Sequence, residues 1–143
     1  MKTIEHTNPD GSVVSVWTGD GVTIGGRVTI QDNVTIGANT MIGPEVWVSD
    51  HATLGERAMI GTGAWISEHA TIGEWAMVGS RVMVGGHVTI GRRAVIGGHA
   101  TIGGHATIGD GATIGEWAMV GDGMTVRKHA TIGNNAVIKH GVG

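Results

Sequence analysis

A six-residue period runs without interruption from Thr18 to Ile138 and limits what this chain can fold into. When the large aliphatic residue is counted as position one, 20 of the 21 units carry Ile, Val or Leu there, and only Thr18 departs. Position five is small or β-branched in every unit except the one that contains Met124. In an extended strand, positions five and one face one side and position six faces the other. The period therefore predicts one short strand per unit, built from positions five, six and one, with position six outside.

Positions two, three and four must then turn a corner between successive strands. Position two is Gly in 16 of the 21 units. Glycine suits a corner for either of two reasons, because it adopts positive φ at little cost and because it lets another backbone approach closely. The sequence leaves both reasons open.

Such short strands cannot bury a face alone, so the units must stack into a solenoid. Three units make one triangular coil of 18 residues, and residues 18–143 make seven coils, about 4.8 Å apart as in any sheet. Residues 1–17 precede the repeat and contain Asn8-Pro9-Asp10-Gly11, a turn signal between two β-rich pieces. We predict one all-β molecule, a parallel β-helix over 18–143 whose first coil is covered by an N-terminal β-hairpin over 1–17.

Units such as IGEWAM, IGGHAT and LGERAM resemble the hexapeptide repeat of the left-handed parallel β-helix superfamily, over about nine tenths of the chain. The left hand is what the resemblance implies, since parallel crossovers are otherwise right-handed. The resemblance also implies a prism-shaped subunit that forms a homotrimer. Members of the superfamily include acyltransferases and gamma-class carbonic anhydrases, alongside non-catalytic domains.

Composition excludes several classes of function. The net charge is −3 and only 15% of residues are charged, so no basic stripe for nucleic acid is expected. No apolar run is long enough for a membrane span and no apolar signal core is present, so we expect a cytoplasmic protein that does not contact membranes. The absence of Cys removes disulfides, thiol catalysis and thiolate metal sites.

Residues 18 apart occupy the same place in consecutive coils, so position six forms three outward columns. One column is Thr throughout; it is similar to the Thr ranks of ice-binding β-helices, but ordinary cross-strand Thr stacking explains it. The other two are apolar in their middle coils, which is unusual for the surface of a monomer and indicates an interface. The predicted interface residues are Met41, Met59 and Met77 on one face and Trp47, Trp65 and Met83 on the next. A slim corner between these faces favours a close-packed homotrimer.

Two further columns are candidate ligand-binding sites. One corner of the Thr face carries His51, His69, His87 and His105, one per coil. The opposite corner carries Arg57, Trp75 and Arg93, which can hold a planar anion such as a nucleotide by stacking and charge. For both columns, ordinary surface packing that follows the repeat is the favoured explanation, and ligand binding is the alternative. No resident cofactor is expected, and a divalent metal on the His column is the weaker alternative.

The sequence favours a non-catalytic trimer that binds or scaffolds, with a small anionic ligand in grooves between subunits. The alternative is an acyltransferase that uses acyl-CoA, which needs a His as general base close to a groove between subunits; His87, His99 and His105 are the candidates. This alternative lacks the inserted loop that the resemblance implies for many such enzymes. For a carbonic anhydrase the resemblance implies a pair of histidines five residues apart, and this activity is disfavoured because no two histidines here have that spacing.

Overall fold

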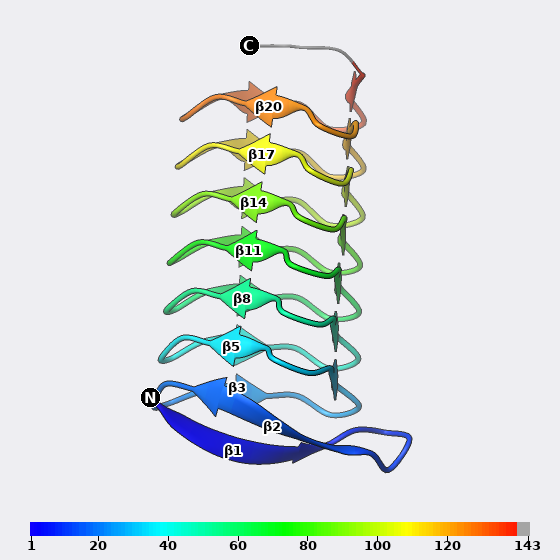
Figure 1. Cartoon of the computed structure of the whole chain (residues 1–143). Helices are drawn as coiled ribbons and strands as arrows, with labels where there is room; N and C mark the ends of the chain where they lie inside the picture. Colours follow the sequence, from blue (N-terminus) through cyan, green and yellow to red (C-terminus); the bar gives the residue numbers. More distant parts are fainter. Residues whose placement is uncertain (140–143) are drawn as a thin grey trace.

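The computed structural model describes residues 1–139, so the last four residues of the predicted β-helix lie outside the described part. Within it the chain is a β-solenoid of stacked triangular coils, with an antiparallel hairpin at its N-terminal end (Figure 1). Three sheets run along its sides, and all strand pairs except the hairpin are parallel. The predicted fold class, a parallel β-helix with a hairpin cap, is confirmed.

Each sheet is named here for its outward side chains. The threonine sheet runs in the order β1 (Lys2–Thr7), β2 (Val13–Thr18), β5 (Thr35–Ile36), β8 (Thr53–Leu54), β11 (Thr71–Ile72), β14 (Thr89–Ile90), β17 (Thr107–Ile108) and β20 (Thr125–Val126). The methionine sheet contains β3 (Thr23–Ile24), β6 (Met41–Ile42), β9 (Met59–Ile60), β12 (Met77–Val78), β15 (Val95–Ile96), β18 (Thr113–Ile114) and β21 (Thr131–Ile132). The tryptophan sheet contains β4 (Thr29–Ile30), β7 (Trp47–Val48), β10 (Trp65–Ile66), β13 (Met83–Val84), β16 (Thr101–Ile102), β19 (Met119–Val120) and β22 (Val137–Ile138).

The strands are one residue shorter than predicted, because paired residues occupy only positions six and one. Position five still takes part in the ladder through its carbonyl group. The N–H of Thr71 donates to the carbonyl of Val88 at 2.8 Å, and the N–H of Gly73 donates to that of Ile90 at 2.7 Å. Each coil is thus bonded to the next at every strand, although each strand is only two residues long.

The core is a narrow shaft filled by positions one and five. Ile72 and Ile90 are at most 1% exposed, and the alanines beside them, Ala76 and Ala94, are fully buried. Large aliphatic and small side chains alternate along each coil, so the interior closes without aromatic residues. Position six faces outward in all three sheets, as predicted.

Glycine at position two serves close approach and not positive φ. A Cβ on Gly73 would lie 2.7 Å from the backbone nitrogen of Arg92 and from the carbonyl carbon of Gly91 in the next coil. The left-handed conformation occurs instead at position four, with φ of 62° at Trp75 and 60° at His87. The N–H of Trp75 donates to the carbonyl of Glu56 in the previous coil at 2.9 Å, so this ladder holds a conformation that non-glycine residues rarely adopt.

The hairpin covers the first coil, and its side chains form hydrogen bonds that a neighbouring strand would otherwise form. Asn8 is buried; its Oδ1 accepts the N–H of Ile30 at 2.8 Å and its Nδ2 donates to the carbonyl of Ile30 at 3.0 Å. His6 Nε2 lies 2.8 Å from the carbonyl of Val28. The exposed edge of β4 is therefore satisfied, which removes a site for edge-to-edge aggregation.

Residues 1–139 include no helix with the length and hydropathy needed to cross a membrane.

Candidate functional site

The three corners of the coil carry the candidate residues, and each corner is named here for its most frequent feature. The arginine corner leads from the threonine sheet to the methionine sheet and includes residues 55–57, 73–75 and 91–93. The glycine corner leads from the methionine sheet to the tryptophan sheet and includes 61–63, 79–81 and 97–99. The histidine corner leads back to the threonine sheet and includes 49–51, 67–69, 85–87 and 103–105.

An apolar hollow of about 440 Å³ lies along the methionine sheet and the glycine corner. We call it the methionine groove. Its wall is formed by Met41, Met59, Met77 and Val95, whose side chains are 37–49% exposed. Its edge is backbone with few side chains, at Gly79-Ser80 and Gly97-Gly98. No charged residue lines it. The groove therefore suits a long, thin and mainly apolar molecule that lies parallel to the axis of the solenoid.

The glycine corner places one chemically useful group, the N–H of Gly98, at the edge of this groove and a second, His99, next to it in the chain. Gly98 lines it, and within residues 1–139 the backbone N–H of Gly98 has no hydrogen-bond acceptor. A Cβ on Gly98 would approach nothing closer than the Ser80 carbonyl, at 3.4 Å, so packing alone does not require glycine here. The next residue, His99, stacks its exposed ring on Trp117, with centroids 4.1 Å apart and planes 3° apart. His99 was one of the candidate general bases predicted from the sequence, whereas the free N–H of Gly98 beside it was not predicted.

The predicted histidine column is present as a continuous stack. The rings of His51, His69, His87 and His105 lie 4.8, 4.7 and 4.9 Å apart and are parallel within 3°. The stack lies on the histidine corner, across the tryptophan sheet from the methionine groove. Its stacking is confirmed, while its role in binding stays a prediction.

The histidine stack does not converge on a point. Parallel rings carry their nitrogens side by side along the axis, whereas a metal needs three or more ligands directed at one centre. Among the described residues, no group of three or more His, Asp or Glu side chains is arranged to hold a metal ion.

The predicted interface residues lie on two adjacent outer faces. Met41, Met59 and Met77 form the wall of the methionine groove. On the tryptophan sheet, Trp47 and Trp65 stack with centroids 4.7 Å apart, and Met83 continues the column with 56% exposure. These two apolar faces meet at the glycine corner, as the 18-residue period predicts.

The arginine corner carries the predicted ladder of planar side chains. The Arg57 guanidinium lies 5.0 Å from the centroid of Trp75, and the Arg93 guanidinium lies 5.9 Å from the same ring on its other side. Both faces of Trp75 are therefore occupied within the subunit. This packing within the subunit is the alternative explanation that the sequence left open for the column, and binding of a ligand at these three residues stays a prediction.

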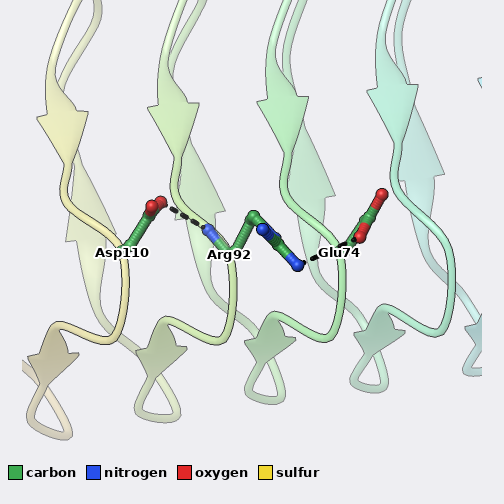
Figure 2. Close-up of polar contacts among 3 residues, drawn as sticks. All are labelled: Glu74, Arg92 and Asp110. Carbon is green, nitrogen blue, oxygen red and sulfur yellow. Dashed lines mark hydrogen bonds and ion pairs between the residues drawn. The ribbon is translucent and has the colours of Figure 1, made fainter.

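Arg92 beside this ladder ties three coils together (Figure 2). Its guanidinium lies 3.6 Å from a carboxylate oxygen of Glu74 in the preceding coil, and its backbone N–H donates to Asp110 Oδ1 in the following coil at 2.9 Å. Asp110 thus faces the backbone of Arg92, whereas the side chain of Arg92 points the other way. An exposed ion pair of this kind contributes little to stability.

Family models identify the repeat directly. A model described as bacterial transferase hexapeptide (six repeats) matches residues 15–50, 69–104 and 87–122. A second model, described as the hexapeptide repeat of succinyl-transferase, matches residues 105–140. A search of curated proteins gives no significant match.

Solved structures share the fold. One is a protein from Bacillus cereus described as an acetyltransferase, with a TM-score of 0.70 and 23% identity, covering 86% of this chain and 72% of that one. Another is a hexapeptide transferase family protein from Anaplasma phagocytophilum, with a TM-score of 0.68 and 17% identity, covering 87% and 73%. A variant of perosamine N-acetyltransferase from Caulobacter crescentus, solved with CoA and GDP-perosamine, has a TM-score of 0.63 and 20% identity, covering 85% and 49%.

Proposed function

Because the chain belongs to the bacterial hexapeptide-repeat transferase family, we propose that it is an acyltransferase that moves an acyl group from coenzyme A to a hydroxyl or an amine. The sequence alone favoured a non-catalytic binding or scaffold protein, with an acyltransferase as the alternative; the family match now favours the acyltransferase. Coenzyme A is chosen as the donor because a solved protein of the same fold, perosamine N-acetyltransferase, was crystallised with CoA.

The observation that carries the proposal is the methionine groove with Gly98 at its edge and His99 as the next residue along the chain. The acyl and pantetheine arm of a coenzyme A thioester is long, flexible and uncharged, with methylene and methyl groups between two amides. A groove of about 440 Å³, walled by methionine side chains and lacking charge, suits such an arm. Methionine is also the apolar residue that adapts most easily to irregular ligand shapes.

Gly98 and His99 fit the steps of acyl transfer. His99 takes the proton from the acceptor O–H or N–H as that atom attacks the thioester carbonyl carbon. The carbonyl oxygen gains negative charge, and the free N–H of Gly98 donates a hydrogen bond to it. The intermediate then collapses, the carbon–sulfur bond breaks, and the His99 imidazolium returns the proton to the departing thiolate of CoA.

The site is completed by a second copy of the chain. In the homotrimer, the methionine sheet of one subunit faces the tryptophan sheet of the next, around the glycine corner. Triangular prisms that meet along one edge leave wedge-shaped clefts between them. Each methionine groove then forms one wall of a cleft, and Trp65 and Met83 of the neighbouring subunit form the opposite wall, which excludes water from the reaction.

Release of the CoA thiol tests the proposal without background, because the chain contains no Cys. The purified protein is mixed with acetyl-CoA, a panel of amino and hydroxyl acceptors and a thiol reagent that absorbs on reaction. We expect thiol release that depends on an acceptor. A His99→Ala variant should lose about 100-fold or more of this rate, as expected for removal of a general base, and should still bind acetyl-CoA.

The matched control is His105→Ala, which removes a stacked histidine from the histidine corner and should leave the rate unchanged. Thermal unfolding of both variants shows that each has kept its fold. Equal rates for the parent and His99→Ala would contradict the assignment of His99. No thermal stabilisation by millimolar acetyl-CoA would contradict the acyltransferase itself.

A further inference from the structure

The closest stack of aromatic rings within residues 1–139 joins His99 to Trp117, in consecutive coils of the glycine corner. Their centroids lie 4.1 Å apart, and their planes are parallel within 3°. The rings of the histidine stack, which follow the spacing of the coils, lie 4.8, 4.7 and 4.9 Å apart. The His99 and Trp117 rings are therefore closer than the repeat alone imposes.

The turn that carries Trp117 is bonded to the coils on both sides. The N–H of Trp117 donates to the carbonyl of Gly98 in the preceding coil at 3.0 Å. In the following coil, Asn134 Oδ1 accepts the N–H of Glu116 at 2.9 Å, and the N–H of Asn135 donates to the carbonyl of Glu116 at 2.9 Å. The indole therefore projects from a fixed stretch of backbone and can hold the ring that stacks on it.

No hydrogen bond orients the ring of His99, although a general base needs a third group that holds it in place. Within residues 1–139, only the ring of His6 forms a hydrogen bond, and neither ion pair includes a histidine. The residue on the other side of His99 in this column is Arg81, and its Cγ lies 3.4 Å from the place of a Cβ on Gly63, one coil further away. The indole of Trp117 is therefore the group that fixes the imidazole plane, and it leaves both ring nitrogens free at the edge.

The indole also suits the charge that His99 carries during the reaction. In the proposed acyl transfer, His99 becomes an imidazolium when it takes the proton of the acceptor, and it stays charged until it returns that proton to the thiolate. An aromatic face carries partial negative charge and attracts a cation that lies over it. Because Trp117 is 56% exposed, water screens part of this attraction, so orientation of the ring is the main effect of the stack.

We propose that Trp117 is the positioning residue of the general base His99, which it holds by stacking its indole on the imidazole. This role rests on the proposed acyl transfer. It concerns the transfer of the proton and not the binding of the donor, because the described lining of the methionine groove does not include Trp117. Loss of the indole should therefore lower kcat and leave the KM for acetyl-CoA unchanged.

Thiol release by variants of Trp117 tests this role. Trp117→Asn removes the ring with a residue type that already occupies the same conformation at Asn33 and Asn39. We expect kcat to fall about 10-fold, less than in His99→Ala, because a loose imidazole still meets the acceptor in some of its orientations. Trp117→Phe keeps a flat ring and should restore kcat to within about 3-fold of the parent. The matched control Trp75→Asn removes an indole of the same backbone conformation from the arginine corner and should leave kcat unchanged.

Proton NMR of the histidine rings reports the stack without any measurement of activity. A ring that lies 4.1 Å above an indole is shielded by its ring current, so the carbon-bound ring protons of His99 should resonate upfield in the parent. Their resonances are assigned by their absence in His99→Ala. They should move downfield in Trp117→Asn and stay in place in Trp75→Asn. An unshielded His99 ring in the parent would overturn the proposal.

The kinetic outcomes separate this role from the proposed function itself. Parental kcat in Trp117→Asn, with His99→Ala inactive, would overturn the positioning role and leave the acyltransferase standing. A raised KM for acetyl-CoA with unchanged kcat would also overturn the role, because it would show that the indole binds the donor. Equal losses of kcat in Trp117→Asn and Trp75→Asn would assign the effect to the fold and overturn it as well. A parent that releases no thiol with any acceptor would overturn the proposed function and the positioning role together.

Discussion

The threonine sheet and the methionine sheet are built on the same core and differ in what they present outside. Thr71 pairs with Thr89 in one and Met77 with Val95 in the other, in the same parallel register. The inward side chains of both are buried and mostly aliphatic, such as Ile72 and Val78. Since a threonine column satisfies this fold, the apolar column of the methionine sheet is not needed for folding. Its chemistry therefore points to a contact beyond the subunit.

The largest expected effect concerns the core that the sheets share, so it should destabilise both sheets. In Gly73→Ala the new Cβ would lie 2.7–2.8 Å from backbone atoms of Gly91 and Arg92, which cannot move without separating two coils. We expect a loss of about 1–3 kcal/mol in the free energy of unfolding, measured with denaturant.

Gly86→Ala is the matched control for that loss. Its Cβ would meet only the Glu68 carbonyl, at 3.5 Å, and its φ is not in the left-handed region. This variant should gain about 0.4–1 kcal/mol, because alanine restricts the unfolded chain more than glycine does. A similar loss in both variants would contradict the close-approach role of position two.

A smaller effect should distinguish the methionine sheet from the threonine sheet. Met59→Glu places a charge on the wall of the methionine groove, which faces a neighbouring subunit in the proposed trimer. Light scattering should show the mass fall from three chains to one, while the fold of each chain persists. Thr71→Glu makes the corresponding change on the threonine sheet and should leave the trimer intact. Loss of the trimer in Thr71→Glu alone would reverse the assignment of the two faces.

The smallest effect is confined to the turn of the hairpin, between β1 and β2. The Ser12 hydroxyl and then the Ser12 N–H donate to Asp10 and lower the pKa of its carboxyl below 3.8. A lowered folded-state pKa means that the contribution to stability is present above the unfolded-state pKa and is lost as pH falls through the folded-state value.

Amide exchange of the hairpin in the parent and in Asp10→Ala measures this contribution. The parent should be better protected at about pH 6, and the difference should shrink as the pH falls below 3.8. A difference that grows on acidification would show that the charged carboxylate opposes the turn.

The 18-residue period allowed the columns to be predicted from sequence, because each coil repeats the place of the one before. The stacks of His69 on His87 and of Arg57 on Trp75 follow from that period alone. The hairpin over 1–17 followed from the turn signal at Asn8-Pro9-Asp10-Gly11. These features depend only on where a residue lies along the axis, and residue numbers give that position.

Features that depend on the path of the backbone within a coil could not be predicted from residue numbers. The sequence left open whether glycine served positive φ or close approach, and only the backbone path shows that Trp75 takes the first role and Gly73 the second. The free N–H of Gly98 is the absence of a hydrogen-bond partner, and it can be recognised only once the carbonyl groups of the neighbouring coils are placed in space.

Methyl resonances of the methionines test the central claim most directly, because the acyl donor is expected to lie on the methionine groove. The protein is labelled with 13C at its methionine methyl groups and titrated with acetyl-CoA. We predict that the resonances of Met59 and Met77 shift with one shared dissociation constant, while the buried Met124 and the N-terminal Met1 stay in place. Saturation with acetyl-CoA that leaves Met59 and Met77 unshifted would contradict the account.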